Sequence, residues 1–159
     1  MRLEPLYVAR FAYPEGWGMT LEGPHGSEGN YLFIAEGRVE GAIAGRLRGV
    51  NHPRSRVDGS ALPDVQGAIE TDDGAVVLFD WRGYARPYPE GRRQIVVSGT
   101  HLSQDERYAR LNDAVCVGTG EIRPDTGGGP RQVVGHQVEF VIEVAELVWE
   151  PVAESPAGS

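Results

Sequence analysis

The strongest constraint on the fold is a β-hairpin signal between residues 64 and 84. Two runs rich in β-branched and aromatic residues, 64–72 and 75–84, flank the dipeptide Asp73-Gly74. Asp-Gly tolerates the positive φ angles of a two-residue type I′ turn, so we expect such a turn here. The chain is therefore built around at least one antiparallel strand pair.

Further strand patterns recur along the chain. Alternating or continuous apolar residues predict strands over 3–13, 31–36, 93–102, 114–123 and 133–149. Regularly spaced glycines between residues 37 and 49 indicate bends of a curved sheet, where a missing side chain relieves crowding. Ser103 and Glu106 have the spacing of a capping box, which predicts one short helix over 104–111.

These elements predict an all-β fold. About eight antiparallel strands close most readily into a single β-barrel of the calycin or lipocalin kind, which can hold one small ligand. A sandwich of two sheets is the alternative. We expect one barrel domain over 1–150, a disordered tail over 151–159, and a loop over 14–30 that is either a lid over a cavity or a surface excursion.

Charge and residue usage narrow the function. The formal net charge of -8 argues against binding to nucleic acid or to an anionic membrane surface. All 15 basic residues are arginines, so chemistry that needs a lysine, such as a Schiff base or a Walker A phosphate site, is excluded. The single cysteine, Cys116, and the absence of a signal-like N-terminus favour a cytoplasmic protein.

No cofactor or metal is expected. The four histidines lie far apart in the sequence and no metal-binding or dinucleotide-binding motif occurs. The expected partner is a small molecule, and association of the chain with itself is left open.

Several blocks resemble one family. They are Leu3–Leu6, the run from Asp64 to Ala75, the run from Tyr108 to Asn112, and Val117–Gly120. Together they resemble the family catalogued as domain of unknown function 3237, also known as the UPF0311 proteins. The resemblance implies a compact antiparallel β-barrel with a cavity, and the family has no well-established general activity.

One block departs from the family pattern. Members carry Gly-Gly-x-Asp-Trp before the hairpin, whereas this chain has the run from Asn51 to Gly59. Asp58 is the counterpart of the aspartate in that block, while the glycine pair and the tryptophan are missing. Asp64 matches the family more cleanly. If the family site lies at this block, this chain has a remodelled version of it.

Candidate site residues gather around the same region. Four arginines between 46 and 56 adjoin acidic residues and a histidine, and alternation places Arg46 and Arg48 on one face, where both could point inward. Arginine binds carboxylates and enolate-like oxygens through two parallel hydrogen bonds, while structural pairing with neighbouring acids is the simpler alternative. The predicted catalytic residues are Asp58, Asp64 and His101. The predicted ligand-binding residues are Arg46, His52, Arg54, Trp81, Tyr108 and Asn112.

Two functions fit these residues. In the first, the barrel is a cofactor-independent isomerase, cyclase or lyase-like enzyme, in which a carboxylate with a raised pKa or His101 moves a proton. In the second, the barrel is a carrier or sensor that holds an apolar anion without converting it. A purely structural or oligomerisation role is a third possibility.

Overall fold

The computed structural model describes residues 1–88, 92–124 and 138–152. Its strands are β1 (Arg2–Gly23), β2 (Gly26–Gly41), β3 (Gly45–Asn51), β4 (Arg54–Ser55), β5 (Ala61–Leu62), β6 (Asp64–Thr71), β7 (Val76–Tyr88), β8 (Arg92–Leu102), β9 (Val115–Pro124) and β10 (Val138–Val148). A single 3₁₀ helix, η1 (Ala109–Asp113), lies between β8 and β9.

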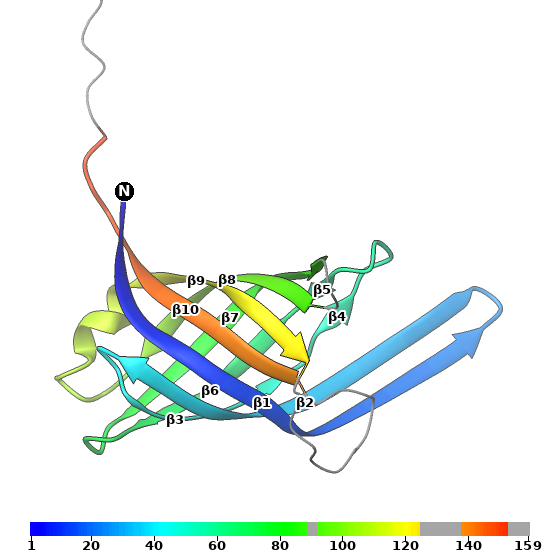
Figure 1. Cartoon of the computed structure of the whole chain (residues 1–159), viewed down its shortest axis with the longest axis horizontal. Helices are drawn as coiled ribbons and strands as arrows, with labels where there is room; N and C mark the ends of the chain where they lie inside the picture. The colour runs from blue at the N-terminus through cyan, green and yellow to red at the C-terminus, as the bar shows by residue number, and fades with distance from the viewer. Residues whose placement is uncertain (89–91, 125–137, 153–159) are drawn as a thin grey trace, which may run out of the picture.

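Eight of these strands close into an antiparallel barrel. The hydrogen-bonded order around it is β1, β2, β3, β6, β7, β8, β9 and β10, and β10 pairs again with β1. The short strands β4 and β5 form a ribbon attached to β7 at Ala85. The predicted fold class, a single antiparallel barrel of about eight strands, is confirmed (Figure 1).

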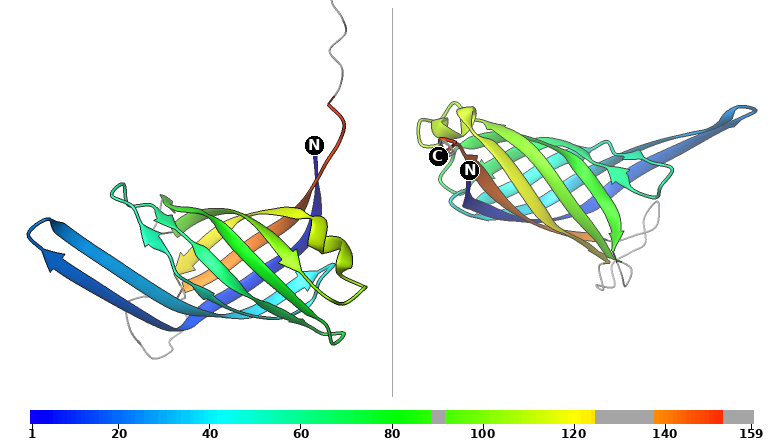
Figure 2. Two further views of the ribbon diagram at one scale, coloured as in Figure 1. Left: turned by 180° about the vertical axis from the view of Figure 1, so that it is seen from behind. Right: turned by 90° about the horizontal axis from the view of Figure 1, so that it is seen from above.

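The barrel has two different ends. At one end lie η1 and the β6–β7 turn (Figures 1 and 2). At the other end, β1 and β2 continue past the barrel as a long two-stranded arm (Figure 1), formed by residues 17–23 and 26–32. We call these the η1 end and the arm end. The prediction of a loop over 14–30 is therefore wrong, because most of these residues belong to paired strands.

The inward rows of the strands fill the barrel with aromatic and aliphatic side chains, including Phe11, Phe79, Trp81 and Phe140. Glycines make room for them. A Cβ on Gly99 would lie 2.5 Å from Cδ1 of Trp81, and one on Gly37 would lie 2.0 Å from the Arg10 carbonyl oxygen. The expectation that glycines mark crowded bends of a curved sheet is confirmed.

Two local predictions need correction. The hydrogen bonds that join Thr71 and Ala75 enclose three residues, and Gly74 has a φ of 90°, so the β6–β7 turn is one residue longer than predicted. The side chain of Thr71 causes this, because its hydroxyl accepts the Ala75 N–H in place of the backbone.

The short helix predicted near 104–111 is present as the 3₁₀ helix η1, but it covers Ala109–Asp113 and so begins later than predicted. Residues 104–108 form bends and turns, and only the 3₁₀ helix η1 follows. The Ser103 hydroxyl donates to the carbonyl oxygen of Val76 on β7. This hydrogen bond attaches the segment to the barrel wall. Most of the predicted tail, residues 153–159, lies outside the described residues.

Candidate functional site

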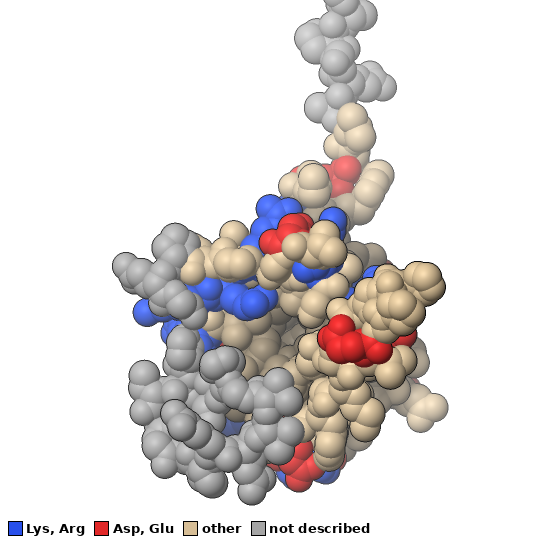
Figure 3. Space-filling model, turned by 90° about the vertical axis from the view of Figure 1, so that its right-hand side faces the viewer, with Lys and Arg blue, Asp and Glu red and all other residues tan. Residues whose placement is uncertain are grey.

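The arm end of the barrel is hollowed, as the space-filling view in Figure 3 shows. Figure 3 looks onto this end and shows the hollow, with arginines gathered along one side of it. Three polar residues lie on inward rows near this end: Tyr13 on β1, Asn51 on β3 and Arg93 on β8. We call Tyr13, Asn51 and Arg93 the mouth residues.

Tyr13 and Asn51 form one hydrogen-bonded unit. Asn51 is 4% exposed; its Nδ2 donates to the Tyr13 hydroxyl over 2.6 Å, and its Oδ1 accepts the backbone N–H of Asp64. Burial raises the pKa of Tyr13 far above its usual value, so the phenol stays protonated. Because the phenol oxygen already accepts from Asn51, its own proton is available to an acceptor on a ligand.

Arg93 supplies a positive charge on an inward row of β8, at the same end of the barrel. It lies on the same row of β8 as the buried Ile95 and Val97, and its Nη1 is 3.5 Å from the carbonyl oxygen of Gly59. Among the described residues, the only polar contact of its guanidinium group is with that carbonyl oxygen. A guanidinium without an ion pair can bind an anionic oxygen.

Aromatic rings form the floor beneath the mouth residues. Tyr13 stacks on Phe33 with ring centroids 4.8 Å apart, and it contacts Phe140 at 4.7 Å. Phe140 in turn stacks on Phe11 at 4.5 Å. Flat apolar walls with a few polar groups above them are typical of small-molecule sites.

A second polar cluster is buried deeper, towards the η1 end. The Tyr7 hydroxyl lies 2.7 Å from Nε2 of His101, and the Tyr7 ring stacks on Trp81 with centroids 6.4 Å apart. Burial lowers the pKa of His101 to about 4, so its imidazole is neutral near pH 7. Within the described residues, Nδ1 of His101 and Nε1 of Trp81 have no hydrogen-bond partner.

The two clusters belong to one internal structure. Rings connect them in sequence, because Trp81 contacts Phe11 at a centroid distance of 6.3 Å and Phe11 stacks on Phe140, which contacts Tyr13. The structure thus joins two predicted residues, His101 and Trp81, through Tyr7, which the sequence interpretation did not single out.

Four predicted residues lie on the rim of the arm end. Asp58 is exposed in the β4–β5 turn, where Ser60 donates to it, and these hydrogen bonds lower the pKa of its carboxyl. Asp64 faces outward and accepts from Arg82 over 3.3 Å. His52 and Arg54 are exposed. The raised pKa that a carboxylate base requires is therefore not found at Asp58.

The inward orientation suggested for Arg46 and Arg48 is wrong. Both do share one face, but it is the outer face of β3, because the buried residues of that strand are Gly45, Leu47 and Asn51. The two guanidinium groups lie 3.8 and 3.4 Å from the carboxylate of Glu36 on β2. Both arginines therefore pair with a neighbouring acid, which is the simpler of the two alternatives that the sequence left open.

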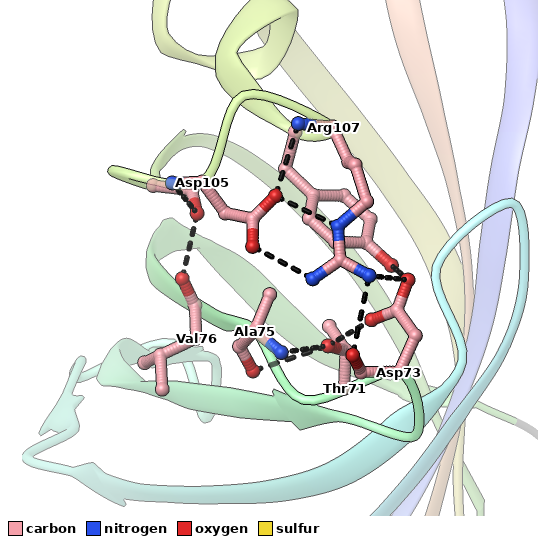
Figure 4. A network of polar contacts seen from close by, with 8 residues as sticks. Thr71, Asp73, Ala75, Val76, Asp105 and Arg107 are labelled. Atoms are coloured by element: carbon pink, nitrogen blue, oxygen red, sulfur yellow. Dashed lines mark hydrogen bonds and ion pairs between the residues drawn. The ribbon is translucent and has the colours of Figure 1, made fainter.

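Tyr108 and Asn112 lie at the η1 end, away from the mouth. The Tyr108 hydroxyl donates to Asp73 over 2.8 Å, in a network that also contains Arg107 and joins the segment before η1 to the β6–β7 turn (Figure 4). Asn112 accepts the backbone N–H of Ser103 and donates to its carbonyl oxygen. These contacts brace the loop between β8 and β9.

Sequence alone carried a signal for the mouth residues that the interpretation missed. Tyr13 and Arg93 share the parity of the apolar residues of their strands, and Asn51 follows Leu47 on an inward row. Polar residues at apolar positions of a strand are expected to be functional or internally paired. Among the described residues, no three histidine, cysteine, aspartate or glutamate side chains are arranged to hold a metal ion.

Two further findings describe the surface. A groove of about 600 Å³ lies on the outer wall, across β2, β1, β10 and β9, and it is lined mainly by apolar residues such as Val8, Val117 and Ala145. It contains none of the predicted site residues. In the part of the chain that the structure describes, no helix is long and apolar enough to cross a membrane.

Comparison with solved structures supports the barrel architecture. A protein described as β-barrel-like from Acinetobacter baumannii AYE is 19% identical with a TM-score of 0.68, over 91% of this chain and 95% of that chain. A protein with unknown function from Clostridium acetobutylicum ATCC 824 is 15% identical with a TM-score of 0.70, over 93% and 100%. An enzyme from Penicillium herquei is 19% identical with a TM-score of 0.56, over 89% and 94%.

At these identities the similarity shows the fold alone. No curated protein matches the chain. A family model does match, and it covers residues 1–144, which is the whole barrel except the end of β10. The chain therefore belongs to the family described as "Protein of unknown function (DUF3237)".

Proposed function

We propose that this barrel binds a small, partly apolar organic anion at its arm end. The observation that carries the proposal is that Arg93, for which the described residues supply no ion pair, and the Tyr13–Asn51 unit lie on inward rows at the same end of the barrel. Aromatic rings that contact Tyr13 lie next to them. The guanidinium group would bind the anionic oxygen, the Tyr13 hydroxyl would donate a second hydrogen bond, and the rings of Phe33 and Phe140 would contact the apolar part.

The site chemistry favours an acidic oxygen as the ligand group. Burial keeps Tyr13 protonated near pH 7, so its hydroxyl acts as a donor, and the guanidinium group of Arg93 offers only donors. Asp58 and Asp64 on the rim are paired with Arg56 and Arg82, at 3.9 and 3.3 Å.

A fluorescent aromatic anion, 8-anilinonaphthalene-1-sulfonate, tests the proposal. We expect one molecule to bind per chain and Arg93→Gln to weaken binding by about tenfold or more, because a charge-assisted hydrogen bond contributes about 1.5 kcal/mol or more. Tyr13→Phe should weaken it less. Arg46→Gln, on the outer wall, is the matched control and should leave affinity unchanged.

Equal affinity in Arg93→Gln, Arg46→Gln and the unmodified protein would refute this site. Native mass spectrometry of gently purified protein then identifies the natural ligand. A co-purified organic acid that Arg93→Gln no longer retains would support the assignment.

A second candidate is acid–base catalysis on the same ligand. The Tyr7–His101 hydrogen bond favours it, because a neutral imidazole with a phenol donor can move a proton. The similar Penicillium herquei protein is described as an enzyme. We assign the proton-carrying role to His101 in preference to Asp58, whose pKa is lowered.

Catalysis and carriage differ in the fate of the ligand. As a cofactor-independent isomerase, cyclase or lyase, the barrel would convert its co-purified ligand on incubation, and His101→Gln would slow the conversion by at least about 100-fold while the ligand stays bound. As a carrier, it would return the ligand unchanged. Asp58→Asn and Asp64→Asn should leave conversion intact; a loss comparable to that of His101→Gln would return the catalytic role to the aspartates.

A further inference from the structure

The arm is the part of the molecule that the proposed site does not explain. Residues 17–23 of β1 and 26–32 of β2 pair with each other beyond the barrel, after a register shift between Ala12 and Glu15. Figures 1 and 2 show this ribbon projecting from the barrel wall. Within the described residues, 15–23 have no strand partner on their second edge.

One face of the arm carries an exposed apolar row. Trp17, Met19 and Leu21 alternate along β1 and are 49%, 77% and 73% exposed, and Leu32 lies opposite Trp17 on β2. An isolated two-stranded ribbon is at best marginally stable in water, and an exposed apolar edge strand tends to pair with another strand. The arm therefore has the properties of a pairing surface.

We propose that the β1 edge of the arm pairs with the same edge of a second copy of this chain. Two identical edge strands form an antiparallel pair about a twofold axis, so one surface serves both partners. With the axis at Met19, Trp17 lies opposite the partner's Leu21, and the apolar row continues across the interface on one face. The two ribbons become one four-stranded sheet.

Charge supports this register. With the twofold axis at Met19, a residue three positions after Met19 faces the partner's residue three positions before it. Glu22 therefore lies opposite the partner's Gly16, and Glu15 lies opposite the partner's Gly23. No two like charges are directly opposed, although the chain has a net charge of -8. The β2 edge is a poorer choice, because its outward residues there include Glu28 and Asn30 in place of a continuous apolar row.

The size of the contact predicts a weak dimer. The contact is limited to two strand edges and the side chains that meet across them, which is characteristic of interfaces below about 1,200 Å² of total buried area. We therefore expect association that depends on protein concentration in the micromolar range. Pairing would set the two apolar rows side by side on one face of the four-stranded sheet, where neighbouring side chains contact across the interface.

Disulfide trapping tests the register. In Met19→Cys the two introduced thiols face each other across the axis, with Cα atoms about 5 Å apart, within the range of a disulfide. The natural thiol of Cys116 is buried and burial raises its pKa to about 11, so it gives little background. We expect covalent dimers of Met19→Cys on mild oxidation. The control is Leu78→Cys, at a residue that is 49% exposed on the barrel wall.

Sedimentation tests association without a new cysteine. The full-length protein should reach the mass of a dimer as its concentration rises, and Met19→Glu should stay monomeric, because it opposes two carboxylates at the axis. Leu78→Glu should still dimerise. The proposal is overturned if the unmodified protein remains monomeric at about 100 μM, or if Met19→Cys crosslinks no faster than Leu78→Cys.

Discussion

The buried imidazole of His101 should make the fold sensitive to mild acid. This side chain is 3% exposed on β8, and its only described polar partner is the Tyr7 hydroxyl. Burial disfavours the charged imidazolium, which lowers the pKa from 6.5 to about 4. Between these two values the unfolded chain binds a proton at this position and the folded chain does not, so stability falls as the pH falls.

The magnitude follows from the interval between the two pKa values. Each pH unit within it corresponds to about 1.4 kcal/mol, so His101 contributes about 3 kcal/mol that is fully present above its unfolded pKa and lost as the pH approaches about 4. This is a large part of the 5–15 kcal/mol by which domains of this kind are typically stable.

Urea unfolding at a series of pH values measures this effect. Because carboxylates also titrate in acid, the informative quantity is the difference between the unmodified protein and His101→Gln. Between about pH 7 and about pH 4.5, the unmodified protein should lose about 2 kcal/mol or more beyond the loss of the variant. His52→Gln, at an exposed histidine, should behave like the unmodified protein. If His101→Gln shows the same pH dependence as the unmodified protein, the buried-imidazole argument is wrong.

Two further predictions concern packing and the η1 end. Gly67→Ala should destabilise the fold by about 1–3 kcal/mol in urea unfolding, because its Cβ would lie 2.2 Å from the Arg48 carbonyl oxygen. Gly23→Ala, whose Cβ would meet only a Gly26 oxygen at 3.8 Å, is the control; equal losses would contradict the crowding argument. Asp73→Asn removes the 3.0 Å ion pair with Arg107 and should lower the melting temperature at neutral pH. Hydrogen bonds from Thr71 and Tyr108 lower the pKa of Asp73, so the difference from the unmodified protein should disappear in acid as its carboxyl becomes protonated.

The candidate site could be predicted only in part. The sequence predicted that the segment between β3 and β6 carries site residues, and these residues lie on the rim of the arm end (Figure 1). It could not place Arg46 on the outer wall, because alternation shows that Arg46 and Arg48 share a face but not which face. It grouped Tyr108 and Asn112 with the other candidates, whereas the topology places them at the opposite end.

Local patterns determined the all-β class, the hairpin and the glycine bends, because strand periodicity and backbone crowding act between near neighbours. Strand alternation also predicts that Tyr13 and Arg93 face inward. It does not predict that the two residues lie at the same end of the barrel. Only the tertiary structure decided that strands from distant parts of the chain bring Tyr13, Asn51 and Arg93 to one end and Tyr7, Trp81 and His101 into one cluster. Barrel closure causes this, since the pairing of β10 with β1 and of β7 with β8 fixes which residues meet inside.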